Sequence, residues 1–203
     1  MKAFRCTAMF VAAFLGLGSL GLAAAPAATS AQPGNAALAK ALDTAMTPGE
    51  GQKRLEPMIG KFNVKILTWV NPSSQPVESQ ATCVNSWVLG KRYMQMMMSG
   101  TVMNEPFEGI GYVAYDNVAK TYQLDWMDNG STAMTLYQGS FAADDKNATL
   151  KATIADALTG KPSPLELRLS VPNAQGHVSE LWGYGDGKTM FKMMELRHTK
   201  AGM

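Results

Sequence analysis

The chain has 203 residues, with 18 Lys and Arg, 16 Asp and Glu, and a formal net charge of +2. This length is enough for one domain with a sizeable core and too short for two domains of ordinary size. The small net charge excludes a strongly basic nucleic-acid surface, and 46% apolar content excludes an intrinsically disordered chain. Two cysteines cannot build a disulfide scaffold. A single globular domain is therefore expected.

Residues 1–31 have the pattern of a cleavable export signal. Lys2 and Arg5 form a basic start, residues 8–25 are apolar, and small residues lead on to Ala31. These are the parts of a secretory signal peptide. A membrane anchor is the alternative, because about 18 apolar residues approach the length that spans a bilayer. Three glycines interrupt the run and no charged stop follows it, so we predict a periplasmic or secreted protein.

Residues 32–59, called the lead-in below, have a helical pattern. Ala36–Met46 is rich in alanine and carries large apolar residues at a spacing of four, which predicts a short helix. Pro48 and Gly49 end that helix, and Gln52–Met58 adds a further helical turn. We expect the lead-in to cover one end of the domain that follows.

Residues 60–200 read as strands. Apolar and polar residues alternate over Phe62–Val70, and more regularly over Leu165–Val171. Gly, Pro, Asn and Asp separate such segments at short intervals, as expected for tight turns. Ten strands are predicted, near residues 60–70, 77–88, 92–99, 107–115, 121–128, 133–141, 149–156, 165–171, 177–184 and 190–199.

The short connections predict how these strands are arranged. They make consecutive strands antiparallel neighbours. A ten-strand meander is too long for a flat open sheet, and closure removes both exposed edges. We therefore predict an all-β fold, an up-and-down antiparallel barrel of about ten strands that is lipocalin-like, with a short N-terminal helix covering one end. A two-sheet sandwich is the alternative, but it needs longer crossovers.

Two residues are candidates for closing the barrel. Phe62 stands in a Gly-x-Phe motif that opens the first strand, and Arg197 lies on the last strand. The first and last strands are neighbours in a closed barrel, so a guanidinium over an aromatic ring is expected. The pair resembles the Gly-x-Trp and Arg pairing of lipocalin-like barrels, with Phe in place of Trp.

Five blocks of sequence extend in order over most of the predicted domain. They are Pro48–Gly60, Trp87–Tyr93, Pro106–Asn117, Trp126–Asn129 and Phe191–Glu195. Their order and spacing resemble those of the bacterial domain-of-unknown-function family 1579, over roughly residues 46–200. The resemblance implies a lipocalin-like β-barrel that is often exported. It implies no activity and no catalytic residue.

Methionines are abundant, at 15 in the chain. Met94, Met96 and Met98 alternate along one predicted strand, so their thioethers share a face at intervals of about 7 Å. Thioethers are soft ligands that suit Cu(I). Methionine is also an ordinary core residue that adapts to irregular cavities. We favour a core or cavity lining, because other methionines are spread over several strands.

Histidine and cysteine are scarce. His177 and His198 are the two histidines, and we expect both to be solvated residues at the rim. Cys83 is the one thiol left after signal cleavage, and we expect it to be buried in a strand. A reactive Cys83 is the alternative, but the sequence places no base or second cysteine beside it. No metal site and no cofactor are predicted.

Two carboxylates stand beside aromatic residues. Glu180 shares a predicted strand face with Trp182, and Asp128 shares one with Trp126. An inward carboxyl among aromatic rings has a raised pKa and can contact a ligand or act as a general acid. For Asp128 a turn cap is the favoured explanation, and for Glu180 a surface ion pair is about as good an explanation as an inward position. No motif for nucleophilic or phosphate chemistry is present, so no catalytic residue is assigned.

The function predicted first is binding of one small apolar molecule inside the barrel. The predicted ligand-binding residues, with Glu180 as the polar contact, are Met94, Met96, Met98, Tyr112, Trp126, Met134, Glu180 and Trp182. Cu(I) handling by the three alternating methionines is one alternative. A lipocalin-type enzyme with Glu180 or Asp128 as acid or base is another. A register error of one residue would exchange the inner and outer faces of a strand.

Overall fold

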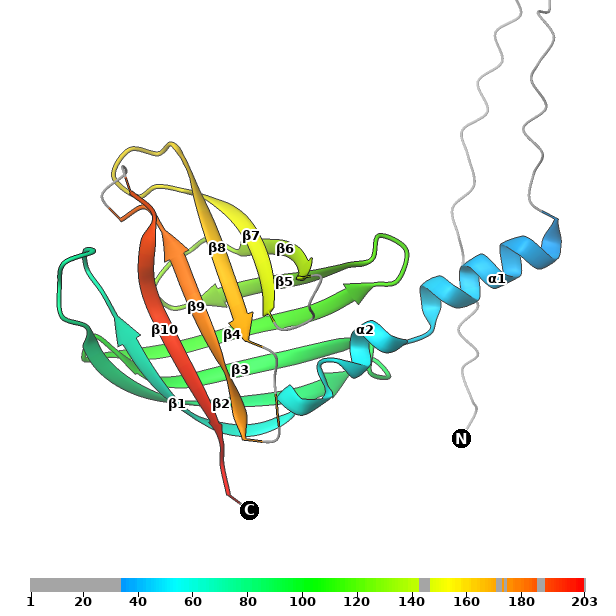
Figure 1. Cartoon of the computed structure of the whole chain (residues 1–203), viewed down its shortest axis with the longest axis horizontal. Helices are drawn as coiled ribbons and strands as arrows, with labels where there is room; N and C mark the ends of the chain where they lie inside the picture. The colour runs from blue at the N-terminus through cyan, green and yellow to red at the C-terminus, as the bar shows by residue number, and fades with distance from the viewer. Residues whose placement is uncertain (1–33, 143–146, 171–172, 174, 186–188, 203) are drawn as a thin grey trace, which may run out of the picture.

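Two short helices and a 3-10 turn precede ten antiparallel strands (Figure 1). The computed structural model describes residues 34–142, 147–170, 173, 175–185 and 189–202. The elements are α1 (Asn35–Met46), α2 (Glu50–Lys53), η1 (Glu56–Met58), β1 (Gly60–Thr68), β2 (Val77–Val88), β3 (Tyr93–Val102), β4 (Glu105–Asp116), β5 (Thr121–Asp128), β6 (Thr135–Phe141), β7 (Asn147–Ala155), β8 (Pro162–Ser170), β9 (Gly176–Gly183) and β10 (Phe191–Lys200).

The ten strands close into a barrel in the order β1-β10-β9-β8-β7-β6-β5-β4-β3-β2. Each strand is antiparallel to both of its neighbours, and the ring closes where β10 lies beside β1 (Figure 1). The predicted all-β fold, strand number and up-and-down topology are confirmed. The period-two alternation explains the result, since β1 buries Phe62, Val64 and Ile66, each of which follows an exposed residue.

The contact that closes the ring differs from the predicted pair. Phe62 points inward and lies opposite Lys200, whereas Arg197 lies opposite Lys65 on the outer face. The cation over the Phe62 ring is therefore the Lys200 ammonium, 5.1 Å from the ring centroid. Lys200 Nζ also donates a hydrogen bond to the carbonyl of Ile59 at 2.7 Å. The predicted stacking of Arg197 on Phe62 is wrong, because residues of opposite strand faces cannot meet.

The second half of the lead-in covers one end of the barrel. Leu55 and Met58 are buried in the main core cluster. Hydrogen bonds hold the segment, among them Tyr122 Oη to the carbonyl of Gly51 at 2.9 Å, Gln52 Nε2 to the carbonyl of Tyr115 at 2.9 Å, and Asn85 Nδ2 to the carbonyl of Met58 at 2.8 Å. The cover is thus α2 with η1.

The predicted covering role is wrong for α1 itself. The helix has the predicted extent, but every one of its residues is exposed. It projects away from the barrel (Figure 1). The apolar spacing that predicted the helix does not bury it here.

Replacing Gly51 by alanine tests the cover. A Cβ at Gly51 would lie 2.1 Å from the Tyr115 ring, whereas a Cβ at Gly49 meets no atom closer than 3.9 Å. We expect Gly51→Ala to lower the free energy of unfolding by roughly 1–3 kcal/mol through overpacking. Gly49→Ala is the matched control and should leave it nearly unchanged. Urea unfolding followed by circular dichroism measures both, and equal effects would contradict this account of the cover.

The predicted signal peptide, residues 1–31, lies outside the described residues. Among the helices that the structure describes, none is both long and apolar enough to cross a membrane.

Candidate functional site

A cavity of about 240 Å³ lies inside the barrel. Inward-facing side chains of eight strands line it, and most of them are apolar. They are Ile66, Met96, Met98, Val102, Phe107, Leu124, Trp126, Asp128, Thr135, Tyr137, Leu165, Leu167, Ser179, Leu181, Met194, Leu196 and His198. Such a lining, apolar with a few polar groups, is typical of sites for small organic ligands.

The two ends of this cavity differ. Val102 ends β3, Asp128 ends β5 and Thr135 begins β6, so the cavity reaches the end of the barrel opposite the cover. His198 lies near the end of β10, on the side that α2 and η1 cover. We call the first end the mouth and the second the floor. A ligand that enters at the mouth meets apolar walls before it reaches the floor.

Trp126 forms a fixed part of the wall. Its indole lies against β4 at Gly109 and Gly111, where an added Cβ would come within 2.4 Å and 2.9 Å of the ring. Its Nε1 donates a hydrogen bond to Asp128 Oδ2 at 2.8 Å, and its ring stacks with Phe107 at a centroid distance of 6.5 Å. The Gly-x-Gly motif thus makes room for an indole, and the wall is formed before any ligand arrives.

Four of the predicted site residues face the interior. Met96, Met98 and Trp126 line the cavity. Met94 is fully buried in the cluster that contains Leu55 and Met58, beneath the cover. The three alternating methionines therefore do share the inner face, as predicted. Binding of Cu(I) by them stays a prediction.

The other four predicted residues lie outside the cavity. Tyr112 faces outward, because β4 turns Gly111 and Val113 to the interior, and its hydroxyl accepts a hydrogen bond from Gln95 at 2.8 Å. Met134 precedes β6 and is 52% exposed. Glu180 and Trp182 lie on the outer face of β9, whose cavity-lining residues are Ser179 and Leu181. The prediction that these four residues line the cavity is therefore wrong.

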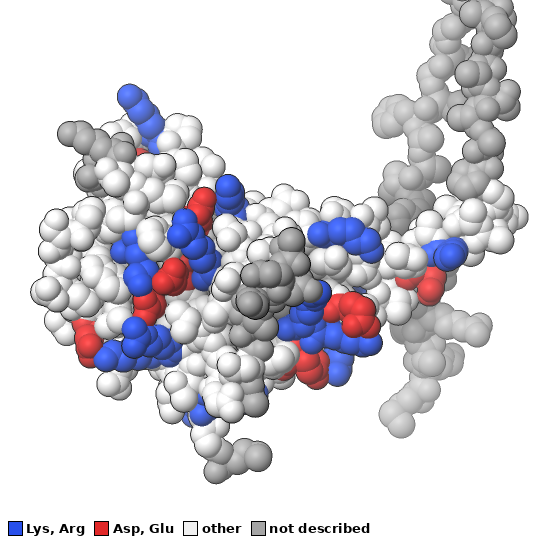
Figure 2. Space-filling model, viewed as in Figure 1, with Lys and Arg blue, Asp and Glu red and all other residues white. Residues whose placement is uncertain are grey.

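Glu180 and Trp182 belong to an ionic cluster on the outer surface. Glu180 accepts hydrogen bonds from Trp182 Nε1 at 3.0 Å and Lys192 Nζ at 3.2 Å, and Arg168 stacks over the Trp182 ring at 4.1 Å. Acidic and basic side chains alternate over β8–β10 (Figure 2). Glu180 therefore forms the surface ion pair that was the alternative interpretation of this residue. It is not a polar contact inside the barrel.

Two histidines that the sequence predicts at the solvated rim lie inside the barrel. His177 and His198 are buried, with 5% and 4% of their surfaces exposed, so the prediction of solvated rim residues is wrong. They face each other across β9 and β10, and both point inward. Burial lowers the pKa of His177 to about 3, with a contribution from His198, and burial lowers the pKa of His198 to about 4. Both imidazoles are uncharged at neutral pH.

Asp128 and Cys83 have the structural roles that the sequence favoured. Asp128 Oδ1 accepts a hydrogen bond from the backbone N–H of Gly130 at 3.0 Å, which caps the turn. Cys83 is fully buried and donates to Asn85 Oδ1 at 3.1 Å, and burial raises its pKa to about 12. Its thiol is therefore unreactive at neutral pH. Among the described residues, no three His, Cys, Asp or Glu side chains are grouped to hold a metal ion.

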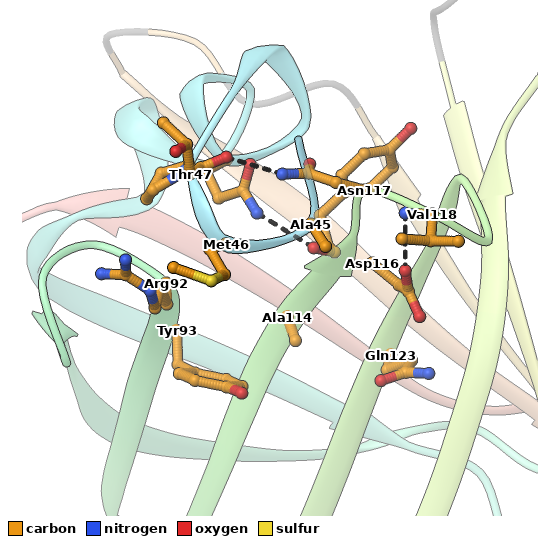
Figure 3. Close-up of a pocket in the computed structure, with 13 residues that line it drawn as sticks. Ala45, Met46, Thr47, Arg92, Tyr93, Ala114, Asp116, Asn117, Val118 and Gln123 are labelled. Atoms are coloured by element: carbon orange, nitrogen blue, oxygen red, sulfur yellow. Dashed lines mark hydrogen bonds between the residues drawn. The ribbon is translucent and has the colours of Figure 1, made fainter. Parts of the chain in front are cut away.

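A second hollow, of about 370 Å³, lies between the α1–α2 connection and the edge of the barrel (Figure 3). Asn117 Nδ2 fixes this connection by donating to the carbonyls of Thr44 at 2.9 Å and Thr47 at 2.7 Å. Asp116 accepts hydrogen bonds from the backbone of Val118 and Ala119, and these lower its pKa. The polar groups here already serve the turn, so this hollow is a weaker candidate than the cavity.

Comparison with known proteins agrees with this architecture. The model of a family described as "Protein of unknown function (DUF1579)" matches residues 47–200. The crystal structure of Rv2717c from M. tuberculosis is similar in fold, with a TM-score of 0.58 and 14% sequence identity. The similarity covers 77% of this chain and 100% of that one. No curated protein matches this sequence.

Proposed function

The chain belongs to the DUF1579 family, and from the interior of its barrel we propose that it binds a small apolar molecule. The observation that carries the proposal is the cavity of about 240 Å³ with its largely apolar lining. Burial of an apolar ligand there is favourable by about 25 cal/mol for each Å² removed from water. Because Trp126 is already held by Asp128 and Phe107, little side-chain ordering opposes binding.

Reducing the space in the cavity should weaken this binding. Met96 lines the cavity, whereas Met97 is its neighbour on the outer face and is 54% exposed. We expect Met96→Phe to weaken binding of octane or 1-octanol at least tenfold, by occupying the space, and Met97→Phe to leave it unchanged. Tryptophan fluorescence during titration measures binding, and Trp126→Phe identifies the reporting indole. If Met96→Phe binds both compounds as the parent does, the proposed site is wrong.

Native mass spectrometry of the purified chain adds an unbiased observation. An organic mass that Met96→Phe lacks would support the proposal. A copper adduct that Met96→Ala loses would instead support Cu(I) handling by Met94, Met96 and Met98, for which their shared inward face is the favourable observation.

We also propose that the protein acts after export, since residues 1–31 carry the three parts of a signal peptide. An intact mass of the protein recovered from the periplasm would give the cleavage position. An uncleaved chain retained in the membrane fraction would support the anchor instead.

A further inference from the structure

Two stacked imidazoles form part of the cavity floor. The rings of His177 and His198 are 4.1 Å apart between centroids and 12° from parallel. The Phe62 ring packs nearly perpendicular to both, with centroid distances of 5.4 Å and 6.2 Å. Strand pairing and this packing hold the rings in place, and only His198 reaches the cavity.

These imidazoles carry polar atoms without partners. Within the described part of the chain, both ring nitrogens of His177 and Nδ1 of His198 are buried without a hydrogen bond. Leaving a buried polar group unsatisfied costs about 1–3 kcal/mol. A leucine in place of His177 or His198 would avoid this cost. Packing alone therefore does not explain why these two positions carry a hydrogen-bonding side chain. His198 lines the cavity, and its Nε2 is not among these enclosed atoms, so Nε2 is the nitrogen that a ligand atom can reach.

The charge inside the cavity restricts what this ligand can be. None of the described residues lining it is Lys or Arg, and its one acidic residue, Asp128, lies at the mouth. Tyr137 is also uncharged, because burial and the nearby charge of Asp128 raise its pKa to about 12. A carboxylate ligand would find no cation here, and it would lose its hydration. An uncharged head group is favoured.

The size of the cavity restricts the ligand further. At about 30 Å³ for each water-sized group, a volume of about 240 Å³ accommodates roughly eight non-hydrogen atoms. A hydroxyl suits the floor, because it donates and accepts, and a neutral imidazole nitrogen does one or the other according to its tautomer.

We propose that His198 recognises the hydroxyl group of an uncharged aliphatic alcohol or phenol of about eight non-hydrogen atoms. The hydroxyl bonds to the imidazole at the floor, and the apolar part lies between Met96, Met98 and Trp126. His177 stacks behind His198 and does not line the cavity. The inference rests on the proposed function and names the ligand class of the same site.

Three probes of matched length test it: 1-octanol, octane and octanoate, titrated at pH 7.5 with tryptophan fluorescence as the readout. In the parent protein, 1-octanol should bind at least tenfold more tightly than octanoate. His198→Leu should weaken 1-octanol about tenfold, the value of one lost hydrogen bond, and should not weaken octane. His198→Gln keeps a hydrogen-bonding side chain and should retain most of the affinity for 1-octanol.

His177→Leu is the matched control, since it removes the other ring of the stack without touching the cavity lining. It should leave the preference for 1-octanol over octanoate within about threefold of the parent, a shift of less than 1 kcal/mol. If octanoate binds as tightly as 1-octanol, or if His198→Leu affects 1-octanol and octane alike, this inference is overturned while cavity binding stands. If the parent binds none of the three, the proposed function fails with it.

Discussion

The free energy of unfolding should fall by on the order of 4 kcal/mol between pH 7.5 and pH 5, because His177 and His198 are buried uncharged. Their pKa values are about 3 and about 4 in the folded protein, against an ordinary value of 6.5. As the pH falls below 6.5, the unfolded chain takes up two protons that the folded barrel excludes. The unfolded state is therefore favoured, and the loss continues until the folded pKa values are reached.

Between pH 7.5 and pH 5, the change in the free energy of unfolding comes from the imidazoles rather than from the carboxylates. Asp116 and Asp156 have pKa values lowered by hydrogen bonds from their own turns, so their contributions are present above their ordinary pKa and are lost only at more acidic pH. Urea unfolding at a series of pH values gives the dependence. The double variant His177→Gln, His198→Gln should be nearly independent of pH from 7.5 to 5. The same slope in parent and variant would show that the imidazoles do not cause it.

Phe62→Ala should cost about 4 kcal/mol, within the range for truncating a buried phenylalanine. The ring is fully buried, packs in a cluster with Val64, Cys83 and Met98, and touches both imidazoles. Its removal leaves a cavity that β1 and β10 cannot fill without shifting, because their backbones are fixed by pairing. The loss should appear in the urea midpoint with an unchanged m-value.

Phe107→Ala is the matched control for this truncation. Phe107 also faces the interior, but it lies at the mouth, is half-buried and has the Trp126 ring as its aromatic neighbour. We expect a loss of roughly 1–2 kcal/mol, because less surface is removed from contact and the mouth can relax. An equal loss in both variants would contradict the view that the floor, rather than the mouth, is the tightly packed region.

The strands and their order could be predicted because both signals are local. Alternation over Phe62–Val70 and turn residues such as Asn129 and Gly130 each act within a few residues, and short turns leave consecutive strands no choice but to pair. The family resemblance placed the same barrel over nearly the same residues. The same signals do not say which face of a strand is inside.

Strand β9 shows why the site was only partly predictable. Its apolar-looking face carries Trp182 and its polar face carries His177 and Ser179, so hydropathy favours the wrong orientation. Arg168 on the neighbouring strand makes the outward indole tolerable by stacking on it. That contact depends on how β8 and β9 are aligned with each other, and the local sequence pattern of neither strand determines this alignment. On β3 the first three inward residues are all methionine, and there the predicted residues do face inward.

The β1–β10 pairing joins the two ends of the domain, whereas every other pairing in the described barrel joins strands consecutive in sequence. It closes a loop that contains eight strands, and it therefore carries the largest loop-closure entropy in the fold. Phe62 and His198 stand on opposite sides of it, so the cavity floor exists only in the closed ring. Ligand binding and the pairing of β1 with β10 are therefore linked by mass action. A compound bound at the floor protects these first and last strands of the barrel from local unfolding.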